Sequence, residues 1–195
     1  MKGWRIVFWV GASELLLLSA LLMVSKADPE GLHQAMRISA EISAGIFLIV
    51  FVASSLHRSI RSRWTAALLR ERRYIGLSFA LSMAIHLAAI FLAYLRTPGT
   101  MPPVDTIFYA GALGYAFTAA LAFTSSDRAV QCLGPKRWRW LHAVGSYYLW
   151  FIFMTTYALG AAHSLRHLVL AVLFGLALVF KLSGNFFKSQ CIDNA

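Results

Sequence analysis

Long apolar segments alternate with short polar segments along most of this chain. Six apolar segments have the length of a membrane-spanning helix, at about 6–24, 34–56, 74–95, 106–124, 142–161 and 165–183. A helix of about 20 residues crosses a hydrocarbon core of about 30 Å. The chain shows no alternating ten-residue strands of the kind that build a membrane barrel. The pattern therefore predicts an all-α integral membrane bundle of six transmembrane helices, forming a single domain over 1–195.

The polar segments between these spans carry turn signals and basic residues. Asp28-Pro29 predicts a turn after the first span. Pro98-Gly99 and Pro102-Pro103 break a helix after the third span, and Gly134-Pro135 does so before the fifth. The segment 57–73 holds six arginines and one glutamate, and we expect it to connect the second and third spans. The segment 125–141 is expected to connect the fourth and fifth.

Composition agrees with this class. Hydrophobic residues make up 59% of the chain and charged residues only 13%, about half of what a soluble domain carries. The net charge of +10 would suggest nucleic acid as a partner in a soluble protein. Here the basic residues lie between apolar spans, so we expect them to set topology and to contact anionic lipid headgroups of the bilayer, with no nucleic acid as a partner.

The distribution of basic residues predicts the orientation. Fourteen lysines and arginines fall at the two chain ends and in the second and fourth connections: Lys2, Arg5, Arg58, Arg61, Arg63, Arg70, Arg72, Arg73, Arg128, Lys136, Arg137, Arg139, Lys181 and Lys188. Four fall on the other side: Lys26, Arg37, Arg96 and Arg166. Because cytoplasmic loops are enriched in basic residues, both termini are expected in the cytoplasm.

Two further features limit the alternatives. The first span has the look of a signal peptide, but Glu14 interrupts it and no small-x-small cleavage site precedes Lys26, so we expect it to be retained. Cys132 and Cys191 match no metal-ligand spacing, and they indicate neither a disulfide framework nor a zinc site.

Ionisable residues inside the spans are the candidates for chemistry. His86 lies in the middle of the third span, thirteen residues past Arg73 and so about 20 Å from the cytoplasmic end. A histidine at mid-membrane usually binds a group or carries protons, although it also serves as a hydrogen-bonding residue between helices. Glu14 and Glu41 also lie within spans, and Glu41 can pair with Arg37 four residues earlier on the same helix.

Heme is the cofactor that these histidines suggest. A bis-histidine heme needs two histidines on different helices at similar depth, as in helical bundles that hold heme. His57 and His142 meet that condition near the cytoplasmic interface, whereas His86 has no obvious partner at its depth. Arginines at the membrane surface can neutralise heme propionates or simply set topology, and the candidates are Arg58, Arg61, Arg72 and Arg73.

Two motifs resemble a known family. RRYIGLSFALSMAIHL (72–87) and LAFTSSDRAVQCLGPKRWRWLH (121–142) are similar to the ferric-reductase-like transmembrane family, and most similar to the heme-binding membrane subunits of bacterial periplasmic methionine-sulfoxide reductase systems. The family pattern falls on these residues: Arg72, Arg73, Gly76, Leu77, His86, Leu121, Ala122, Thr124, Ser125, Leu133, Gly134, Arg137, Trp138, Leu141 and His142. The six-span layout extends the resemblance over nearly the whole chain.

The resemblance implies a heme b protein in the bacterial inner membrane. Electrons would pass from a cytoplasmic donor or quinone to a periplasmic acceptor, such as a reductase partner. The implied cofactor-binding residues are His86, His142, His57, Arg72 and Arg73, with His86 and His142 as ligands of the heme iron. The chain departs from the family at Thr155, where a second histidine of the fifth span is usual. Three outcomes follow: another pair holds the heme, His86 acts singly in a five-coordinate or proton-handling role, or heme binding is lost.

Two functions from different classes remain after this reading. The first is a heme-containing electron-transfer subunit, which would be part of an oxidoreductase. We expect no flavin or nicotinamide domain, so a quinone or a flavin reductase would supply the electrons. The second is a non-redox membrane scaffold or small transporter that keeps the fold without heme. An absorption spectrum separates the two.

Overall fold

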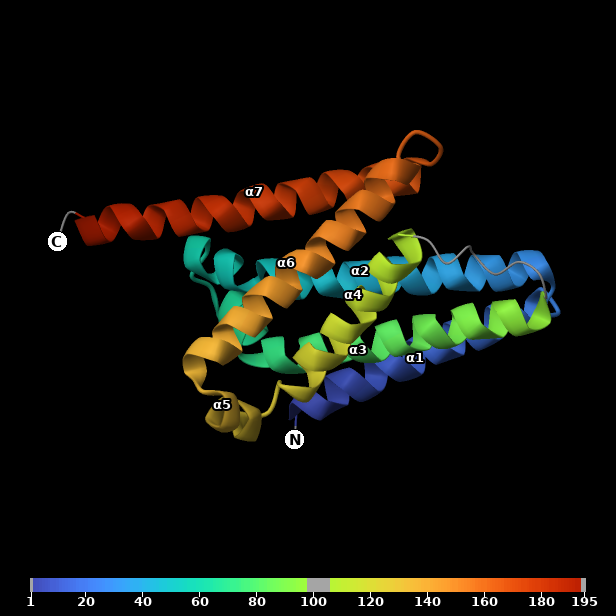
Figure 1. Cartoon of the computed structure of the whole chain (residues 1–195), viewed down its shortest axis with the longest axis horizontal. Helices are drawn as coiled ribbons and strands as arrows, with labels where there is room; N and C mark the ends of the chain where they lie inside the picture. Colours follow the sequence, from blue (N-terminus) through green and yellow to red (C-terminus); the bar gives the residue numbers. More distant parts are fainter. Residues whose placement is uncertain (1, 98–105, 194–195) are drawn as a thin grey trace.

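Seven α-helices make up the part of the chain that the structure, a computed structural model, describes. Backbone is described for residues 2–97 and 106–193, and side chains for 3–97 and 106–183. The helices are α1 (Lys2–Val24), α2 (Pro29–Ser59), α3 (Arg63–Arg96), α4 (Thr106–Phe123), α5 (Asp127–Leu133), α6 (Pro135–Gly160) and α7 (Leu165–Asp193) (Figure 1). The connection expected around Pro98-Gly99 and Pro102-Pro103 lies outside the described residues. The expectation of an all-α fold is confirmed for the described ranges.

Five helices are long and apolar enough to cross a membrane: α1, α2, α3, α4 and α7. They correspond to five of the six expected spans and make this a multi-pass membrane protein. The expected fifth span is also a helix, the 26-residue α6, but it is not among the five. Its histidine, serine, threonines and tyrosines lower its mean hydropathy, and it packs against α4 and α7.

Both basic connections are shorter than expected. The segment 57–73 is largely helical, because α2 continues to Ser59 and α3 begins at Arg63. Ser62 caps α3 by accepting a hydrogen bond from the Thr65 backbone N–H at 3.2 Å. In the segment 125–141, α5 and the first turns of α6 replace the expected loop, and Gly134 separates them with φ +77°. Arginine, leucine and alanine are good helix formers, so these polar segments extend the helices instead of interrupting them.

Successive long helices run back and forth along the long axis of the molecule. The start of α1 and the end of α7 both lie toward the same side (Figure 1). We call that side the basic end; it contains the α2–α3 corner at 60–62 and the short helix α5. The opposite side, called the pocket end, contains the α1–α2 and α6–α7 connections. α4 and α6 are inclined to the other long helices (Figure 1).

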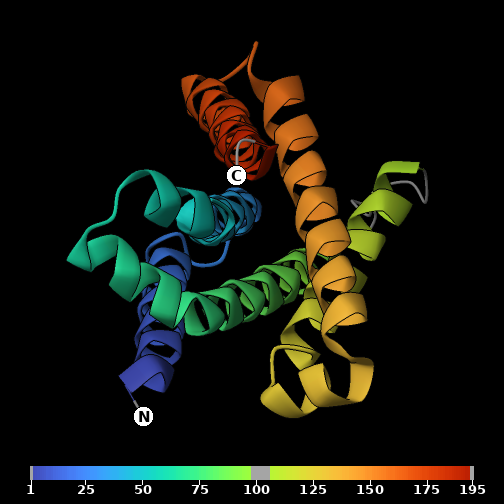
Figure 2. The same ribbon diagram turned by 90° about the vertical axis from the view of Figure 1, so that its left-hand side faces the viewer.

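Aromatic side chains form the centre of the bundle. Phe47 of α2 has its ring 5.3 Å from Phe79 of α3, 5.4 Å from Phe153 of α6 and 6.2 Å from Phe174 of α7, measured between ring centroids. Phe174 is completely buried. The core is therefore shared by α2, α3, α6 and α7. α1 packs against α2 and α3, and α4 against α6 and α3, on the outside of this four-helix core (Figure 2).

Candidate functional site

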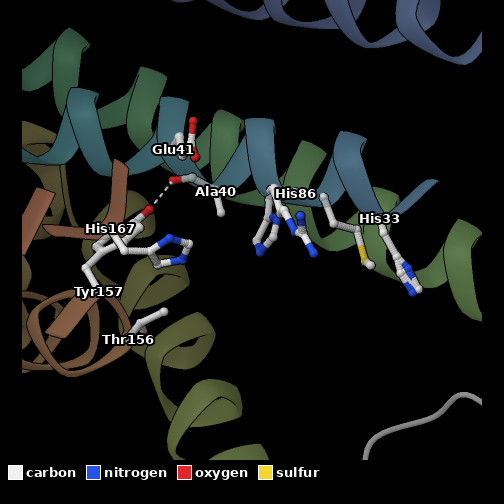
Figure 3. Close-up of a pocket in the computed structure, with 9 residues that line it drawn as sticks. His33, Ala40, Glu41, His86, Thr156, Tyr157 and His167 are labelled. Carbon is white, nitrogen blue, oxygen red and sulfur yellow. Dashed lines mark hydrogen bonds between the residues drawn. The ribbon is translucent and has the colours of Figure 1, made fainter. Parts of the chain in front are cut away.

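A pocket of about 290 Å³ opens among α2, α3, α6 and α7 near the pocket end. Its lining combines three histidines with one pair of opposite charges and a tyrosine: His33, Met36, Arg37, Ala40, Glu41, His86, Thr156, Tyr157 and His167. Figure 3 shows His33 and His86 on one side of the pocket, with His167, Tyr157 and Thr156 on the other. This pocket therefore gathers several groups that can bind a ligand or carry a proton.

One face of α2 forms a wall of the pocket. The lining residues from this helix fall at positions 33, 36, 37, 40 and 41, the three- and four-residue spacing that places side chains on one helical face. Asp28 fixes the start of this helix, because its Oδ1 accepts a hydrogen bond from the Gly31 N–H at 2.7 Å. The wall is thus placed by the capped first turn of α2.

His86 enters the pocket from α3 and is held by α2. Its Nδ1 lies 2.9 Å from Ser39 Oγ, and Ser39 is completely buried. Ser39 also donates its only hydroxyl proton to the Met36 carbonyl oxygen at 2.9 Å. With the hydroxyl proton on the Met36 carbonyl, the serine oxygen accepts a hydrogen bond from His86 Nδ1–H, and the two roles depend on the tautomer of the imidazole. We assign this tautomer to His86, and it leaves the lone pair on Nε2.

His167 enters the same pocket from α7. Its ring centroid lies 5.6 Å from that of Tyr157, whose hydroxyl donates to the Ala40 carbonyl oxygen at 3.3 Å. This hydrogen bond ties α6 to α2 beside the pocket (Figure 3). The Nδ1 atom of His167 is buried and has no hydrogen-bond partner among the described residues. The imidazole therefore retains an unused nitrogen.

Arg37 and Glu41 both line the pocket, but they do not form the ion pair that their spacing suggested. No described contact joins the two side chains at salt-bridge distance. Glu41 instead lies close enough to Tyr157 for its charge to act on the phenol. The pairing expectation is therefore wrong for this structure.

The other predicted cofactor residues lie at the basic end and do not share one site. His57 Nδ1 is 3.1 Å from Thr65 Oγ1, whereas His142 Nε2 is 3.1 Å from Thr124 Oγ1. The ends of α2 and α6 that carry these histidines lie apart in both views (Figures 1 and 2). The structure therefore does not bring together the depth-matched pair His57 and His142.

The two motif arginines have different surroundings. Arg73 forms an ion pair with Asp127 of α5, with Nη1 and Oδ2 3.3 Å apart. Arg72 lies close enough to His142 and to Lys181 of α7 for its charge to act on both. Lys181 Nζ donates to the Phe51 carbonyl oxygen at 2.9 Å. A basic cluster of Arg72, His142 and Lys181 therefore lies at the opposite end of the bundle from the pocket.

Position 155, where a second histidine was expected, does not face the pocket. Thr155 Oγ1 donates to carbonyl oxygens of its own helix, those of Phe151 at 2.9 Å and Ile152 at 3.0 Å. Its neighbour Thr156 lines the pocket instead. The imidazole that lines the pocket together with Thr156 is that of His167 on α7. The family pattern would have placed a second imidazole on α6.

Sequence reasoning missed His167 as a neighbour of His86, and it missed the buried serines. Depth was counted along helices assumed to be upright, and that count fails where a helix is inclined (Figure 1). The signal for the serines was present: Ser39 and Ser43, like Ser78, Ser82 and His86, recur every four residues on one helical face. Small residues at such spacing let membrane helices approach closely.

The chain was compared with models of known protein families, with curated proteins and with solved structures, and none matches it. Within the described ranges, no group of three or more histidine, cysteine, aspartate or glutamate side chains is placed to hold a metal ion.

Proposed function

We propose that this chain is a heme-binding electron-transfer subunit of a membrane oxidoreductase. The observation that carries the proposal is that His86 and His167, from two different helices, line one pocket and each retains an imidazole nitrogen that no described residue uses. Two histidines from facing helices are the ligand set by which bundles hold heme b. The resemblance of 72–87 and 121–142 to the ferric-reductase-like family supports the same conclusion.

The chemical state of His86 fits an iron ligand. Metal-binding histidines usually donate their other ring N–H to a nearby acceptor, which orients the ring and makes the ligating nitrogen more basic. Ser39 Oγ supplies that acceptor here, 2.9 Å from Nδ1. The lone pair that remains, on Nε2, is available to the pocket. The Nδ1 atom of His167 is unpaired but buried, so this ring would turn to bring a nitrogen to the iron, and either imidazole nitrogen can bind a metal.

The rest of the pocket would offer a dianionic, largely apolar ring system one positive charge and apolar surface, beside the negative charge of Glu41. Arg37 supplies a guanidinium for a propionate, and Met36, Ala40 and Tyr157 supply apolar surface. Heme would provide a one-electron carrier, while the protein sets the ligands and the polarity around it. The residues of this chain would orient the ring plane and limit the access of water. The basic cluster of Arg72, His142 and Lys181 would remain at the end where electrons enter.

The proposal includes an orientation. α6 acts as the sixth span, so that six crossings leave both termini in the cytoplasm of a bacterial inner membrane. The fourteen-to-four asymmetry of basic residues supports this, because basic loops stay on the cytoplasmic side. The basic end then faces the cytoplasm, where a quinone or a flavin reductase donates electrons. The pocket end faces a periplasmic acceptor, such as a reductase partner.

A second candidate is a non-redox membrane scaffold or small transporter. The small amount of buried surface on the peripheral helices supports it: only 11% of the apolar window of α4 and 17% of that of α1 are buried inside the chain. Faces so open are covered by lipid or by helices of a partner. An assembly subunit would present such faces whether or not it bound a cofactor.

Absorption spectroscopy of purified variants tests the proposal. We expect a Soret band in the wild-type protein and its loss or conversion to a high-spin form in His86→Ala and His167→Ala. His57→Ala and His142→Ala are matched controls, since each removes a histidine bonded to a threonine at the basic end. Both controls should retain the wild-type spectrum. A spectrum lost in the controls and kept in the pocket variants would refute the assignment of the site.

A further inference from the structure

A carboxyl group near the middle of α1 is buried without a partner. Glu14 is only 2% exposed, and neither of its oxygens has a hydrogen-bond partner in the described part of the chain. The hydroxyl of Ser82 on α3 lies close by, although without regular hydrogen-bond geometry. No charged group among the described residues acts on this carboxyl. An acidic residue in such a position needs a proton, a cation or water to neutralise it.

A proton is the neutralising group that these surroundings favour. An ionised carboxylate buried in an apolar interior without a countercharge is very costly, and the group takes up a proton instead. Protonated Glu14 needs only one acceptor for its O–H, and Ser82 Oγ lies on the correct side to provide it. A dehydrated metal cation would need several more oxygen ligands than the side chains here supply.

Buried hydroxyls continue from Ser82 toward the pocket. Ser82 Oγ on α3 is 2.7 Å from Ser43 Oγ on α2, and both side chains are completely buried. One helical turn further along, Ser39 Oγ on α2 is 2.9 Å from His86 Nδ1 on α3. The two pairs form successive rungs between the same two helices. We call Glu14, Ser82, Ser43 and Ser39 the polar seam.

We propose that Glu14 is a proton-binding site that exchanges its proton with water through Ser82 and Ser43 of the polar seam. The carboxyl O–H passes its proton to Ser82 Oγ while the hydroxyl proton of Ser82 moves to Ser43 Oγ. The hydroxyl proton of Ser43 leaves for a water molecule between the rungs, and a proton arriving along the reverse route restores the carboxyl.

The row of buried serines continues toward the basic end, but its hydrogen bonds between helices do not. Ser78 lies one turn from Ser82 in the opposite direction on α3 and is also completely buried. Its hydroxyl donates to the Tyr74 carbonyl oxygen of its own helix at 3.0 Å, as the hydroxyl of Ser39 donates to the Met36 carbonyl oxygen. Unlike Ser39 and Ser82, Ser78 has no described hydrogen bond to a neighbouring helix. This inference does not rest on the proposed heme, because none of the seam residues is a proposed ligand.

Infrared spectroscopy of the protein in lipid vesicles tests the first part of the proposal. We expect a carbonyl stretching band of a protonated carboxylic acid at neutral pH that is absent from Glu14→Gln. Gln is isosteric with the neutral acid, so this variant should fold. The band should persist when sodium replaces potassium in the buffer. Absence of the band in the wild type, or its disappearance in sodium, would overturn the proton-binding assignment.

Transfer of the same vesicles to deuterated buffer tests the exchange path. Deuteration of the carboxyl shifts its band, so the rate of the shift reports how fast the proton at Glu14 is replaced. We expect Ser43→Ala to slow this rate about tenfold or more, which corresponds to about 1.4 kcal/mol of barrier. Ser78→Ala is the matched control and should leave the rate unchanged. Equal rates in wild type and Ser43→Ala, or slowing by Ser78→Ala alone, would refute the path.

These experiments separate the two proposals. Both can be made on protein without heme, and the carboxyl band does not depend on any histidine ligand. A carboxyl band without a Soret band would leave the polar seam intact and refute the heme. A Soret band without a carboxyl band would support the heme and refute the proton-binding site at Glu14.

Discussion

The close approach of α6 and α7 at Gly160 allows a quantitative prediction. A Cβ atom at this position would lie 2.5 Å from His167 Cδ2 and 2.9 Å from His167 Cγ. Carbon atoms do not approach this closely, so Gly160→Ala must displace the imidazole or separate the helices. Inserting a methyl group into a packed interior typically costs about 1–3 kcal/mol. For a chain of this length, that corresponds to a fall in the melting temperature of about 2–12 °C.

Thermal unfolding in detergent, followed by intrinsic fluorescence, measures this effect. Gly175→Ala is the matched control, because a Cβ atom at Gly175 of α7 meets nothing within 4 Å. Alanine is a better helix former than glycine by about 0.5–1 kcal/mol, so this control should melt at or above the wild-type temperature. Gly160→Ala should also disturb the proposed heme site through His167. Equal melting temperatures for the two variants would refute the packing described here.

Three further predictions concern the core, the pocket and the topology. Phe174→Ala should destabilise the protein by about 3–5 kcal/mol, since this buried ring packs against three other aromatic rings, whereas the exposed Val172→Ala should change the melting temperature little. Thr156→His should add an imidazole to the pocket and change the heme spectrum, whereas Thr155→His should not, because only Thr156 lines the pocket; identical spectra would contradict this. Reporter fusions at Lys2 and at the C-terminus should both report the cytoplasm, and outward signals at both ends would overturn the orientation.

The apolar pattern predicted the helices because membrane spans are strongly constrained. Every backbone polar group within hydrocarbon must be satisfied internally, so a long apolar run has few alternatives to a helix. The same pattern could not locate helix ends. Arginine-rich segments were interpreted as connections, although their residues favour helix and Ser62 and Gly134 mark the real boundaries.

The candidate site was only partly visible in the sequence. His86 was identified because an imidazole in a long apolar run is conspicuous. Its neighbour His167 was not identified, because it lies only two residues past the start of α7. The inclination of the helices decides which residues of different helices lie at the same depth (Figure 1). Glu14 was recognised as lying within a span, but Ser82 and Ser43 were overlooked because serine is common in membrane helices. Contacts between helices depend on rotation about each helix axis, which a list of spans does not contain.

The heme content of the purified wild-type protein tests the central claim most directly. The protein should be isolated from membranes, incubated with excess hemin, freed of unbound hemin and examined by absorption spectroscopy in the oxidised and dithionite-reduced states. The account predicts stoichiometric heme with a low-spin spectrum, as expected for two imidazole ligands from α3 and α7. A folded protein without a Soret band after this treatment would contradict it and would favour the membrane scaffold or small transporter.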